Sequence, residues 1–325
     1  MAARAPVTAG KSVIFIYLHI ALNEPIDTIG QSFTKIIRPL ALDFIMIPEK
    51  LLFESVKKNV AAALEEDLGS GDVTASLIQE STDISAKVIS RQEAVFCGKL
   101  WVTETVKQIS DQVSVNWHVG DGDWLKKDQL LFSLKGPARP ILSAERTILN
   151  FCQLLSGTAT KAYRYSQLLG NSKVQVLDTR KTIPGLRIAQ KYAVECGGCK
   201  NHRIGLFDAF LIKENHIISC GGIENAIRLA KEKHAGLEVE VEVESLEELD
   251  KAISAGADIA LIDNFTPDTT KQAVEMAKDK IKLEASGGIT LASITEIINS
   301  GVDYISIGDL TKEVLPVDLS MRFDE

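Results

Sequence analysis

Hydrophobic and polar positions in the first half of the chain predict one long helix followed by a β-rich stretch. From Met46 the sequence MIPEKLLFESVKKNVAAALEEDLG carries apolar residues at helical spacing and stops at Gly69, so we expect an amphipathic helix there. Residues 71–140 instead show strand-like alternation, as in ISAKVIS. Within VSVNWHVGDGDWLKKDQLLFSL, residues 121–123 predict a turn between two strands.

A change of pattern follows the prolines at positions 137 and 140. Residues 142–169 have helical spacing, and Gly157 predicts a break in this long helix. We therefore expect a boundary between two parts of the chain near residue 141.

From Val174 onward, short apolar strands alternate with helical segments. The strand-like runs are VQVLD, AFLIK, EVEVEV, IALID, KLEAS and YISIG. Two helix-to-strand joints, SAGADIALID and NSGVDYISIG, resemble each other, and both place Gly after the helix, where a left-handed cap is favoured. Repeated strand–helix units predict parallel strands with right-handed crossovers. A closed α/β barrel and a doubly wound sheet both fit, and we favour the barrel because polar groups follow so many strands.

The ends of these strands share residues that can carry chemistry. They are Asp178, Thr179, Arg180 and Lys181; Lys213, Glu214, Asn215 and His216; the alternating Glu238, Glu240, Glu242 and Glu244; Asp263 and Asn264; Ser286, Gly287 and Gly288; and Gly308 and Asp309. A single charged residue after a strand usually lies in a solvated loop. Because the carboxyl ends of barrel strands meet at one mouth, their joint occurrence on six strands favours a site.

The residue types at this mouth suit an anionic ligand. Arg and Lys bind carboxylates and phosphates, and Arg offers a planar fork. Gly287 and Gly288 would let backbone N–H groups approach a phosphate at the start of the next helix. Glu242 and Asp263 could hold ribose hydroxyls, a magnesium ion or a developing positive charge.

Composition narrows the class of protein further. The 325 residues include 36 Lys plus Arg and 44 Asp plus Glu, a net charge of −8 that argues against a general nucleic-acid binder and a polybasic membrane surface. Apolar residues at 45% and charged residues at 25% exclude disordered and collagen-like chains. The five cysteines are odd in number and scattered, which favours a reducing, cytoplasmic compartment over a disulfide framework.

The N-terminal segment stands apart from these patterns. Residues 12–22 read SVIFIYLHIAL, which is too short to span a bilayer. Arg4 and Lys11 precede this run, so a signal peptide stays open, although no small-residue cleavage site follows clearly. We expect residues 1–45 to be a leader, a peripheral extension or an upstream over-extension of the reading frame.

A family resemblance rests on long ordered motifs. The stretch LDTRKTIPGLRIAQKYAVECGGCKNHRIGLFDAFLIKENHI resembles the quinolinate phosphoribosyltransferases, the decarboxylating nicotinate-nucleotide pyrophosphorylases, as do EEDLGSGDVTASLI, GPARPILSAERTILNFCQLLSGTAT, EVEVESLEELDKAISAGADIALIDNF and EASGGIT. The likeness runs from about Met46 to Phe323. It implies an N-terminal open-faced α/β sandwich over 46–141, an α/β barrel with fewer than eight strands over 142–310, and a C-terminal tail over 311–325.

The resemblance also implies a reaction and an assembly. Phosphoribosyl pyrophosphate would react with quinolinate to give nicotinate mononucleotide, pyrophosphate and CO₂ in NAD biosynthesis, with magnesium assisting. The protein would be a homodimer, or a multimer of dimers, with active sites between subunits. The family's dicarboxylate pocket matches Arg146, Arg180, His202, Arg203 and Lys213, with Arg146 supplied across the dimer interface.

The same resemblance places the second substrate. Its contacts match Lys181, Glu242, Asp263, Ser286, Gly287, Gly288 and Gly308. The implied catalytic residues are Lys181, Lys213, Glu242 and Asp263, and Glu242 and Asp263 would hold magnesium, directly or through water.

Several positions depart from the family pattern. The CxxC at 196–199 stands where the family usually has a glycine run, and with His202 and Cys220 it raises a zinc alternative. We do not favour zinc, because four ligands at standard spacing are not evident. Asp309 and Lys312 replace an Ala and a His that are common in the family.

Three other functions stay open at this point. A phosphoribosyltransferase of the same fold could act on a different heterocyclic acid. An aldolase could use Lys213 as a Schiff-base lysine. A dicarboxylate or phosphate sensor is disfavoured by Glu242 and Asp263, because an anion receptor gains nothing from carboxylates that face its ligand.

Overall fold

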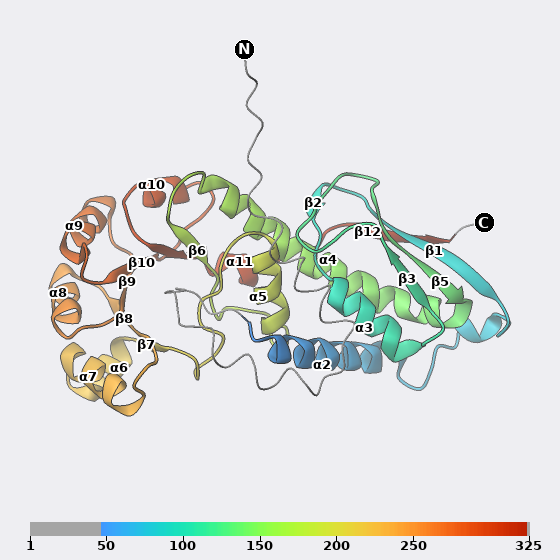
Figure 1. Ribbon diagram of the computed structural model, residues 1–325, viewed down its shortest axis with the longest axis horizontal. Coiled ribbons are helices and arrows are strands. Elements are labelled where there is room, and N and C mark those ends of the chain that lie inside the picture. Colours follow the sequence, from blue (N-terminus) through green and yellow to red (C-terminus); the bar gives the residue numbers. More distant parts are fainter. Residues whose placement is uncertain (1–46, 324–325) are drawn as a thin grey trace, which may run out of the picture. The chain divides into compact units, whose positions relative to one another are not determined.

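The computed structural model describes residues 47–323 (Figure 1). The leader that we expected at residues 1–45 lies outside the described residues. Within 47–323, no helix combines the length and apolar character that a membrane crossing requires.

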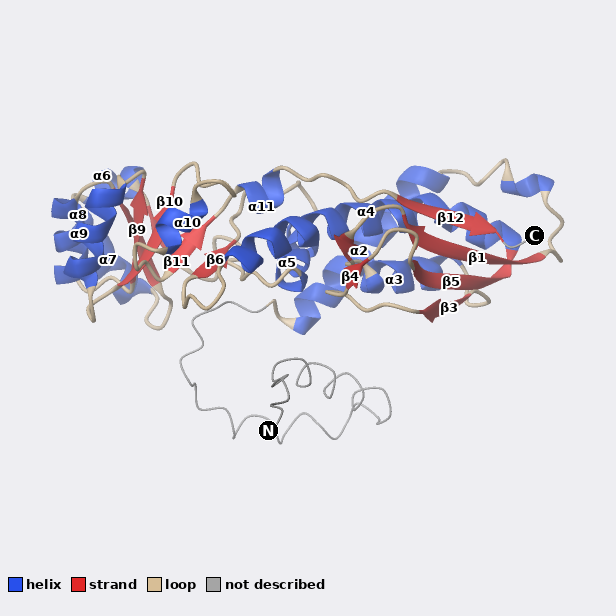
Figure 2. Ribbon diagram, turned by 90° about the horizontal axis from the view of Figure 1, so that it is seen from above, coloured by secondary structure: helices blue, strands red, loops and turns tan. Residues whose placement is uncertain are grey.

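The N-terminal part is built on an antiparallel sheet of four strands in the order β12-β1-β5-β3 (Figure 2). Its strands are β1 (Asp83–Ser90), β3 (Ser114–Trp117), β5 (Leu130–Pro137) and β12 (Leu319–Phe323), and a separate ribbon pairs β2 (Ala94–Val95) with β4 (Trp124–Leu125). Alternate residues such as Val88 and Phe132 are fully buried and form one core with residues of α3 (Lys99–Ile109) and α4 (Ala138–Leu168). The predicted helix from Met46 is α2 (Glu49–Leu68), and a 3₁₀ turn spans Ala75–Leu77. Helices packed on one face of the sheet agree with the open-faced sandwich.

Helix α4 runs without interruption through the expected boundary at residue 141 and through Gly157. The predicted break at Gly157 is therefore wrong. A Cβ on Gly157 would lie 2.3 Å from the carbonyl oxygen of Leu315. The glycine thus serves a close approach of two backbones within a regular helix.

The C-terminal residues return to the N-terminal sheet. Strand β12 pairs antiparallel with β1, from Ala86 opposite Phe323 to Ser90 opposite Leu319. Within the stretch that we expected to be a C-terminal tail, residues 319–323 thus form the strand that completes the four-stranded sheet. The pairing gives the edge of β1 a partner for its backbone hydrogen-bonding groups.

The second part is a sheet of six parallel strands in the order β6-β11-β10-β9-β8-β7. The strands are β6 (Gln175–Leu177), β7 (Phe210–Ile212), β8 (Val239–Val243), β9 (Ile259–Asp263), β10 (Lys282–Ser286) and β11 (Tyr304–Ser306). Their order around the sheet is cyclic, because β6 lies next to β11 and the only seam falls between β6 and β7. A doubly wound sheet would reverse direction at a switch point, so the order confirms the barrel with fewer than eight strands.

The seam is bordered by a short segment of chain. Lys200 forms a parallel bridge with Leu177 at the free edge of β6. This segment follows α5 (Arg187–Cys196), which packs against α4. The remaining helices are α6 (Glu214–Cys220), α7 (Ile223–Lys233), α8 (Leu246–Ser254), α9 (Pro267–Ala277), α10 (Ile294–Ile298) and α11 (Asp309–Lys312).

Alternation along the strands separates two faces. Val239, Val241 and Val243 of β8 belong to the large core that the strands share with the helices. The intervening Glu240 and Glu242 lie on the opposite face, in register with Ile259 and Leu261 of β9. That inner face carries the candidate chemistry.

Candidate active site

The carboxyl ends of the six strands place the sequence-predicted groups at one edge of the barrel sheet. Ser286 at the end of β10 lies in register with Asp263 at the end of β9. Asp263 accepts a hydrogen bond of 2.9 Å from the Asn264 side chain. A Cβ on Gly287 would lie 2.2 Å from Asn264 Oδ1. The loops after β9 and β10 are therefore packed together.

The cationic side of the mouth brings Arg180 close to Arg203. Burial, followed by the nearby positive charge of Arg180, holds the pKa of Arg203 below its ordinary value. Arg203 donates to the carbonyl of Ala209 at 3.2 Å, and Arg180 Nε is buried without a hydrogen-bond partner among the described residues. Neighbouring guanidinium groups repel each other, so an anion between them is favourable.

Lys213 and Glu242 form an ion pair across the ends of β7 and β8. Lys213 is exposed, whereas Glu242 is half-buried. The pair joins the cationic side of the mouth to the acidic side. A ligand carrying both an anionic group and a polar face could contact both residues.

Lys181 lies against the glycine that follows β11. A Cβ on Gly308 would come within 2.9 Å of Lys181 Cδ. The Lys181 carbonyl accepts a 2.8 Å hydrogen bond from the hydroxyl of Thr311 in α11. Gly308 thus makes room for the stem of the lysine.

The glycines after β10 differ from the sequence-based expectation in one respect. Gly287 and Gly288 both have positive φ, at 103° and 56°. Helix α10 begins only at Ile294, so the Gly pair forms a turn of its own and does not open the next helix directly. Gly308 immediately precedes the short helix α11.

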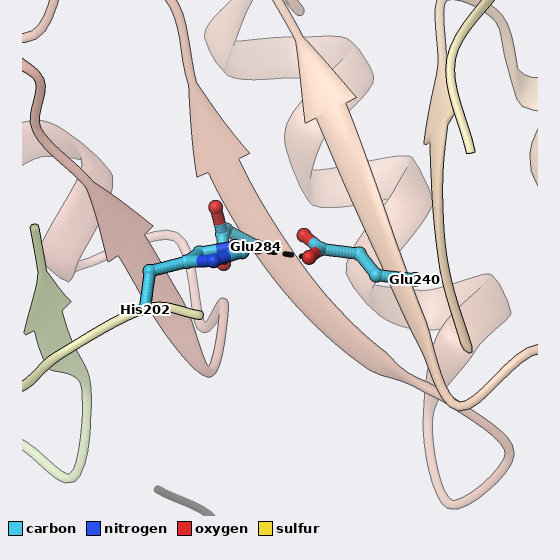
Figure 3. A group of neighbouring side chains, drawn as sticks. All are labelled: His202, Glu240 and Glu284. Atoms are coloured by element: carbon cyan, nitrogen blue, oxygen red, sulfur yellow. Dashed lines mark ion pairs between the residues drawn. The ribbon is translucent and has the colours of Figure 1, made fainter. Parts of the chain in front are cut away.

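The barrel interior holds a buried group of His202, Glu240 and Glu284, of which sequence analysis did not single out Glu284. His202 Nε2 lies 2.9 Å from Glu240 Oε2 and 3.5 Å from Glu284 Oε2 (Figure 3). Glu240 and Glu284 are only 3% and 1% exposed. Burial is the main cause that raises the pKa of each carboxyl to about 8. A neighbouring negative charge also contributes to this rise: chiefly Glu238 for Glu240, and Glu240 for Glu284. The sequence feature that could have pointed to Glu284 is a glutamate within the otherwise strand-like run KLEAS.

Within residues 47–323, the side chains of His202, Glu240 and Glu284 lie close enough together to hold a metal ion. They would offer it one imidazole and two carboxylates. The zinc site that the sequence raised as an alternative, with the cysteines at 196, 199 and 220 beside His202, does not form among residues 47–323. Cys199 donates to the carbonyl of Ala162 and is buried, which raises its pKa to about 12. Cys196 lies beside Cys97 instead.

A buried ion pair supports the loop that carries His202. Lys191 Nζ lies 2.5 Å from Asp178 Oδ1 and donates to the His202 carbonyl at 2.8 Å. Asp178 Oδ1 also accepts from the His202 N–H at 2.9 Å. Burial raises the pKa of Asp178 to about 6, although Lys191 opposes this shift. Asp178 follows β6 but belongs to this support and not to the open mouth.

Two predicted positions lie apart from these contacts. Arg146 is an exposed residue of α4, and the contacts shown for residues 47–323 do not join it to the mouth. Asp309, one of the departures from the family pattern, pairs with Lys161 at 3.0 Å. Lys312, the other, is exposed near Glu313.

A separate cavity of about 740 Å³ lies at the opposite ends of β9 and β10. Its lining includes Asp258, Lys278, Lys282 and Asp303. None of the predicted site residues lines it, so it does not belong to the mouth.

An α/β barrel whose mouth combines guanidinium groups, ammonium groups, carboxylates and a Gly-rich turn defines a class of enzymes for multiply charged small molecules. Residues 72–156 match the N-terminal domain of quinolinate phosphoribosyl transferase, and residues 158–322 match its C-terminal domain. The chain belongs to the quinolinate phosphoribosyl transferase family.

Individual relatives agree with this assignment. The probable nicotinate-nucleotide pyrophosphorylase [carboxylating] of Bacillus subtilis (strain 168) is 42% identical over 257 residues, which covers 79% of this chain and 89% of the relative. The Mycobacterium leprae (strain TN) enzyme of the same type is 36% identical, covering 83% of this chain and 97% of its own. The solved nicotinate-nucleotide pyrophosphorylase from Francisella tularensis has 46% identity and a TM-score of 0.82, covering 86% and 98% of the two chains.

Proposed function

We propose that this protein transfers the phosphoribosyl group of phosphoribosyl pyrophosphate to quinolinate with decarboxylation. The products are nicotinate mononucleotide, pyrophosphate and CO₂, a step of NAD biosynthesis. The observation that carries the proposal is the convergence of cationic and acidic strand ends at one mouth of a family member. Both substrates are multiply charged, so they need such a mouth.

Quinolinate is a small dianion and would bind on the cationic side. Arg180 and Arg203 lie close enough for their positive charges to repel each other, and Lys213 follows β7 on the other side of the seam. His202 belongs to the same loop as Arg203. Arg146 would complete the pocket from the second subunit of a homodimer, which accounts for its exposed position on α4.

Phosphoribosyl pyrophosphate would bind along the ends of β8, β9, β10 and β11. Ser286, Gly287, Gly288 and Gly308 would accept its 5′-phosphate, because the positive-φ turn at Gly287 and Gly288 suits an anion and Gly308 carries no side chain to block it. Glu242 and Asp263 would hold the ribose hydroxyls, and Lys181 would contact the pyrophosphate.

Glu242 and Asp263 also suit magnesium, since carboxylate oxygens at adjacent strand ends are hard donors that this ion prefers. When bound, magnesium would neutralise charge on the pyrophosphate. The proposed cofactor is therefore Mg²⁺, held by these two carboxylates directly or through water.

The chemistry then follows from charge. As pyrophosphate leaves, the ribose carbon gains oxocarbenium character, which Glu242 and Asp263 stabilise, while Lys181 stabilises the leaving anion. The pyridine nitrogen attacks that carbon and becomes cationic. The adjacent carboxylate departs as CO₂ and leaves its bonding electron pair on the ring carbon, where the neighbouring cationic nitrogen stabilises the carbanion. A proton then adds to that carbon. A nucleophilic side chain is not required, and positioning supplies much of the rate.

The assay combines purified protein with quinolinate, phosphoribosyl pyrophosphate and Mg²⁺ and follows nicotinate mononucleotide and CO₂. We expect both products in equal amounts, and only with quinolinate. Mononucleotide from another heterocyclic acid without CO₂ release would indicate a different phosphoribosyltransferase. Borohydride trapping of a carbonyl substrate on Lys213 would indicate an aldolase. Binding of both substrates without turnover would indicate a sensor.

The compartment follows from the cysteines. All five are free in the structure, so the fold needs no oxidising environment. We place the protein in the cytoplasm.

A further inference from the structure

His202 is tied to the barrel from several elements at once. Its imidazole reaches from the loop after α5 across the inner face to Glu240 on β8 and Glu284 on β10 (Figure 3). Its backbone N–H and carbonyl contact Asp178 after β6 and Lys191 on α5. The residue therefore joins both sides of the seam.

The two glutamates are costly to bury. Glu240 Oε1 is buried without a hydrogen-bond partner among residues 47–323, and the buried Glu284 carboxyl shares hydrogen bonds with the side chains of Ser306 and Glu240. Elsewhere on the inner face, Leu177, Ile259 and Tyr304 form a small buried cluster. An apolar pair at positions 240 and 284 would extend that cluster at lower cost. Stability alone does not account for these carboxyl groups.

We propose that Glu240 and Glu284 are positioning residues that act through His202 on Arg203. The next residue supplies the link, because the Arg203 backbone N–H donates to His202 Nδ1 at 2.7 Å. One edge of the imidazole thus faces the carboxyl groups and the other holds the Arg203 backbone. The ring acts as a spacer that sets how far Arg203 projects toward Arg180.

The placement of Arg203 is specific to one substrate. Arg203 is buried and its guanidinium is held by the Ala209 carbonyl, so its reach depends on its backbone position. The glycines proposed for the second substrate lie on the ends of β10 and β11. The effect on turnover rests on the proposed function, whereas the anchoring of the loop does not.

Glu240→Leu and Glu284→Leu remove the partners of the imidazole. We expect the KM for quinolinate to rise roughly 10- to 100-fold, as for a displaced contact group, with little change in the KM for phosphoribosyl pyrophosphate. Glu240→Gln keeps an acceptor toward Nε2 and should recover most of the loss. Glu275→Leu is the control, since Glu275 is an exposed glutamate on α9.

Hydrogen exchange of the backbone amides at 199–203 provides a readout without turnover. Exchange should quicken in Glu240→Leu and stay unchanged in strand β12. Should the leucine variants fail to fold, Glu240→Asp can replace them, because it retracts the carboxylate by one methylene. This variant should also raise the KM for quinolinate, leave the KM for phosphoribosyl pyrophosphate nearly unchanged, and quicken the exchange of the backbone amides at 199–203.

Three results from kinetics or metal analysis, and one from hydrogen exchange, would overturn the proposal. Folded variants could keep both KM values, or both KM values could rise equally, or the purified wild-type protein could hold stoichiometric metal that Glu240→Leu loses. Absence of turnover in the wild-type protein would refute the proposed function alone, because hydrogen exchange still tests the anchoring. Unchanged exchange in a folded Glu240→Leu protein would refute the positioning role.

Discussion

Individual side chains at the mouth are arranged by charge. Lys213 contacts Glu242, whereas Arg203 lies near Arg180 with its charge opposed by burial. The lysine is exposed and contributes little to the core. Its role can therefore be tested with little risk to the fold.

Lys213→Ala removes a cation from the proposed dicarboxylate pocket and should lower kcat/KM roughly 100-fold or more, as for loss of one charge-stabilising group. The thermal unfolding midpoint should stay near wild type, since surface ion pairs contribute little. Lys271→Ala, which removes an exposed lysine that pairs with Asp268 on α9, is the control. Near wild-type kinetics for Lys213→Ala would remove this lysine from the site.

The glycine pair after β10 offers a matched test. A Cβ on Gly287 would clash with Asn264, whereas a Cβ on Gly288 meets nothing within 4 Å. Gly288→Ala should therefore lower the free energy of unfolding only by the cost of placing an L-residue in the left-handed region, about 1 kcal/mol. Gly287→Ala should lower the unfolding midpoint further and raise the KM for phosphoribosyl pyrophosphate. Equal effects in the two variants, measured by calorimetry and steady-state kinetics, would contradict the packing of the two loops.

The positions of Lys213 and Gly288 after strands could be read from the alternation of the sequence, and the structure places them there, while their roles stay predictions. The buried Glu284 was missed, since a single glutamate in the run KLEAS does not reveal which side chain it meets. Its contact with His202 joins positions 82 residues apart in the chain, and only the curvature of the sheet brings them together.

Among the secondary-structure elements, α4 carries the clearest difference from expectation. Gly157 was read as a helix break because glycine has low helix propensity. The structure instead uses the missing side chain to admit the Leu315 carbonyl. Local propensity contained no information about that distant neighbour.

Gly157→Ala tests this interpretation. Helix propensity alone would make alanine more stable by up to about 1 kcal/mol. The contact with Leu315 predicts the opposite sign, a loss of roughly 1–3 kcal/mol from overpacking, measured as the free energy of unfolding. Asn150→Ala, at an exposed position of the same helix, should be neutral or stabilising. A stabilised Gly157→Ala protein would show that α4 and the backbone at Leu315 can move apart without loss of unfolding free energy.

Over the whole molecule, buried acids make stability depend on pH. The pKa of Glu284 is raised from 4.5 to about 8, so the folded state binds this proton more tightly than the unfolded state. Its contribution to stability is complete below pH 4.5 and is lost as the pH rises through 8. Glu284→Gln should therefore flatten the decline of the unfolding midpoint between pH 5 and 8. Glu275→Gln on α9 is the control, and an unchanged decline would show that Glu284 ionises normally.

The proposed dimer can be tested by complementation. If Arg146 acts across the interface, Arg146→Ala and Lys213→Ala each inactivate the site, but a mixed dimer retains one site with both residues. Random mixing makes half of the dimers mixed, so about a quarter of wild-type activity should return. Mixing after denaturation and refolding allows exchange, and each variant refolded alone is the control. No recovery would place Arg146 within its own subunit or outside the site.

The alternation of strands and helices, the residue types at each strand end and the family could all be read from the amino-acid sequence. These properties are local, since they depend on spacing along a few residues and on ordered motifs. Three features became visible in the folded chain alone: β12 completes the first sheet, α4 continues through Gly157, and His202 meets Glu240 and Glu284 inside the barrel. Each of these depends on contacts between residues far apart in the chain, and such contacts form only when strands pair and the sheet curves around its interior.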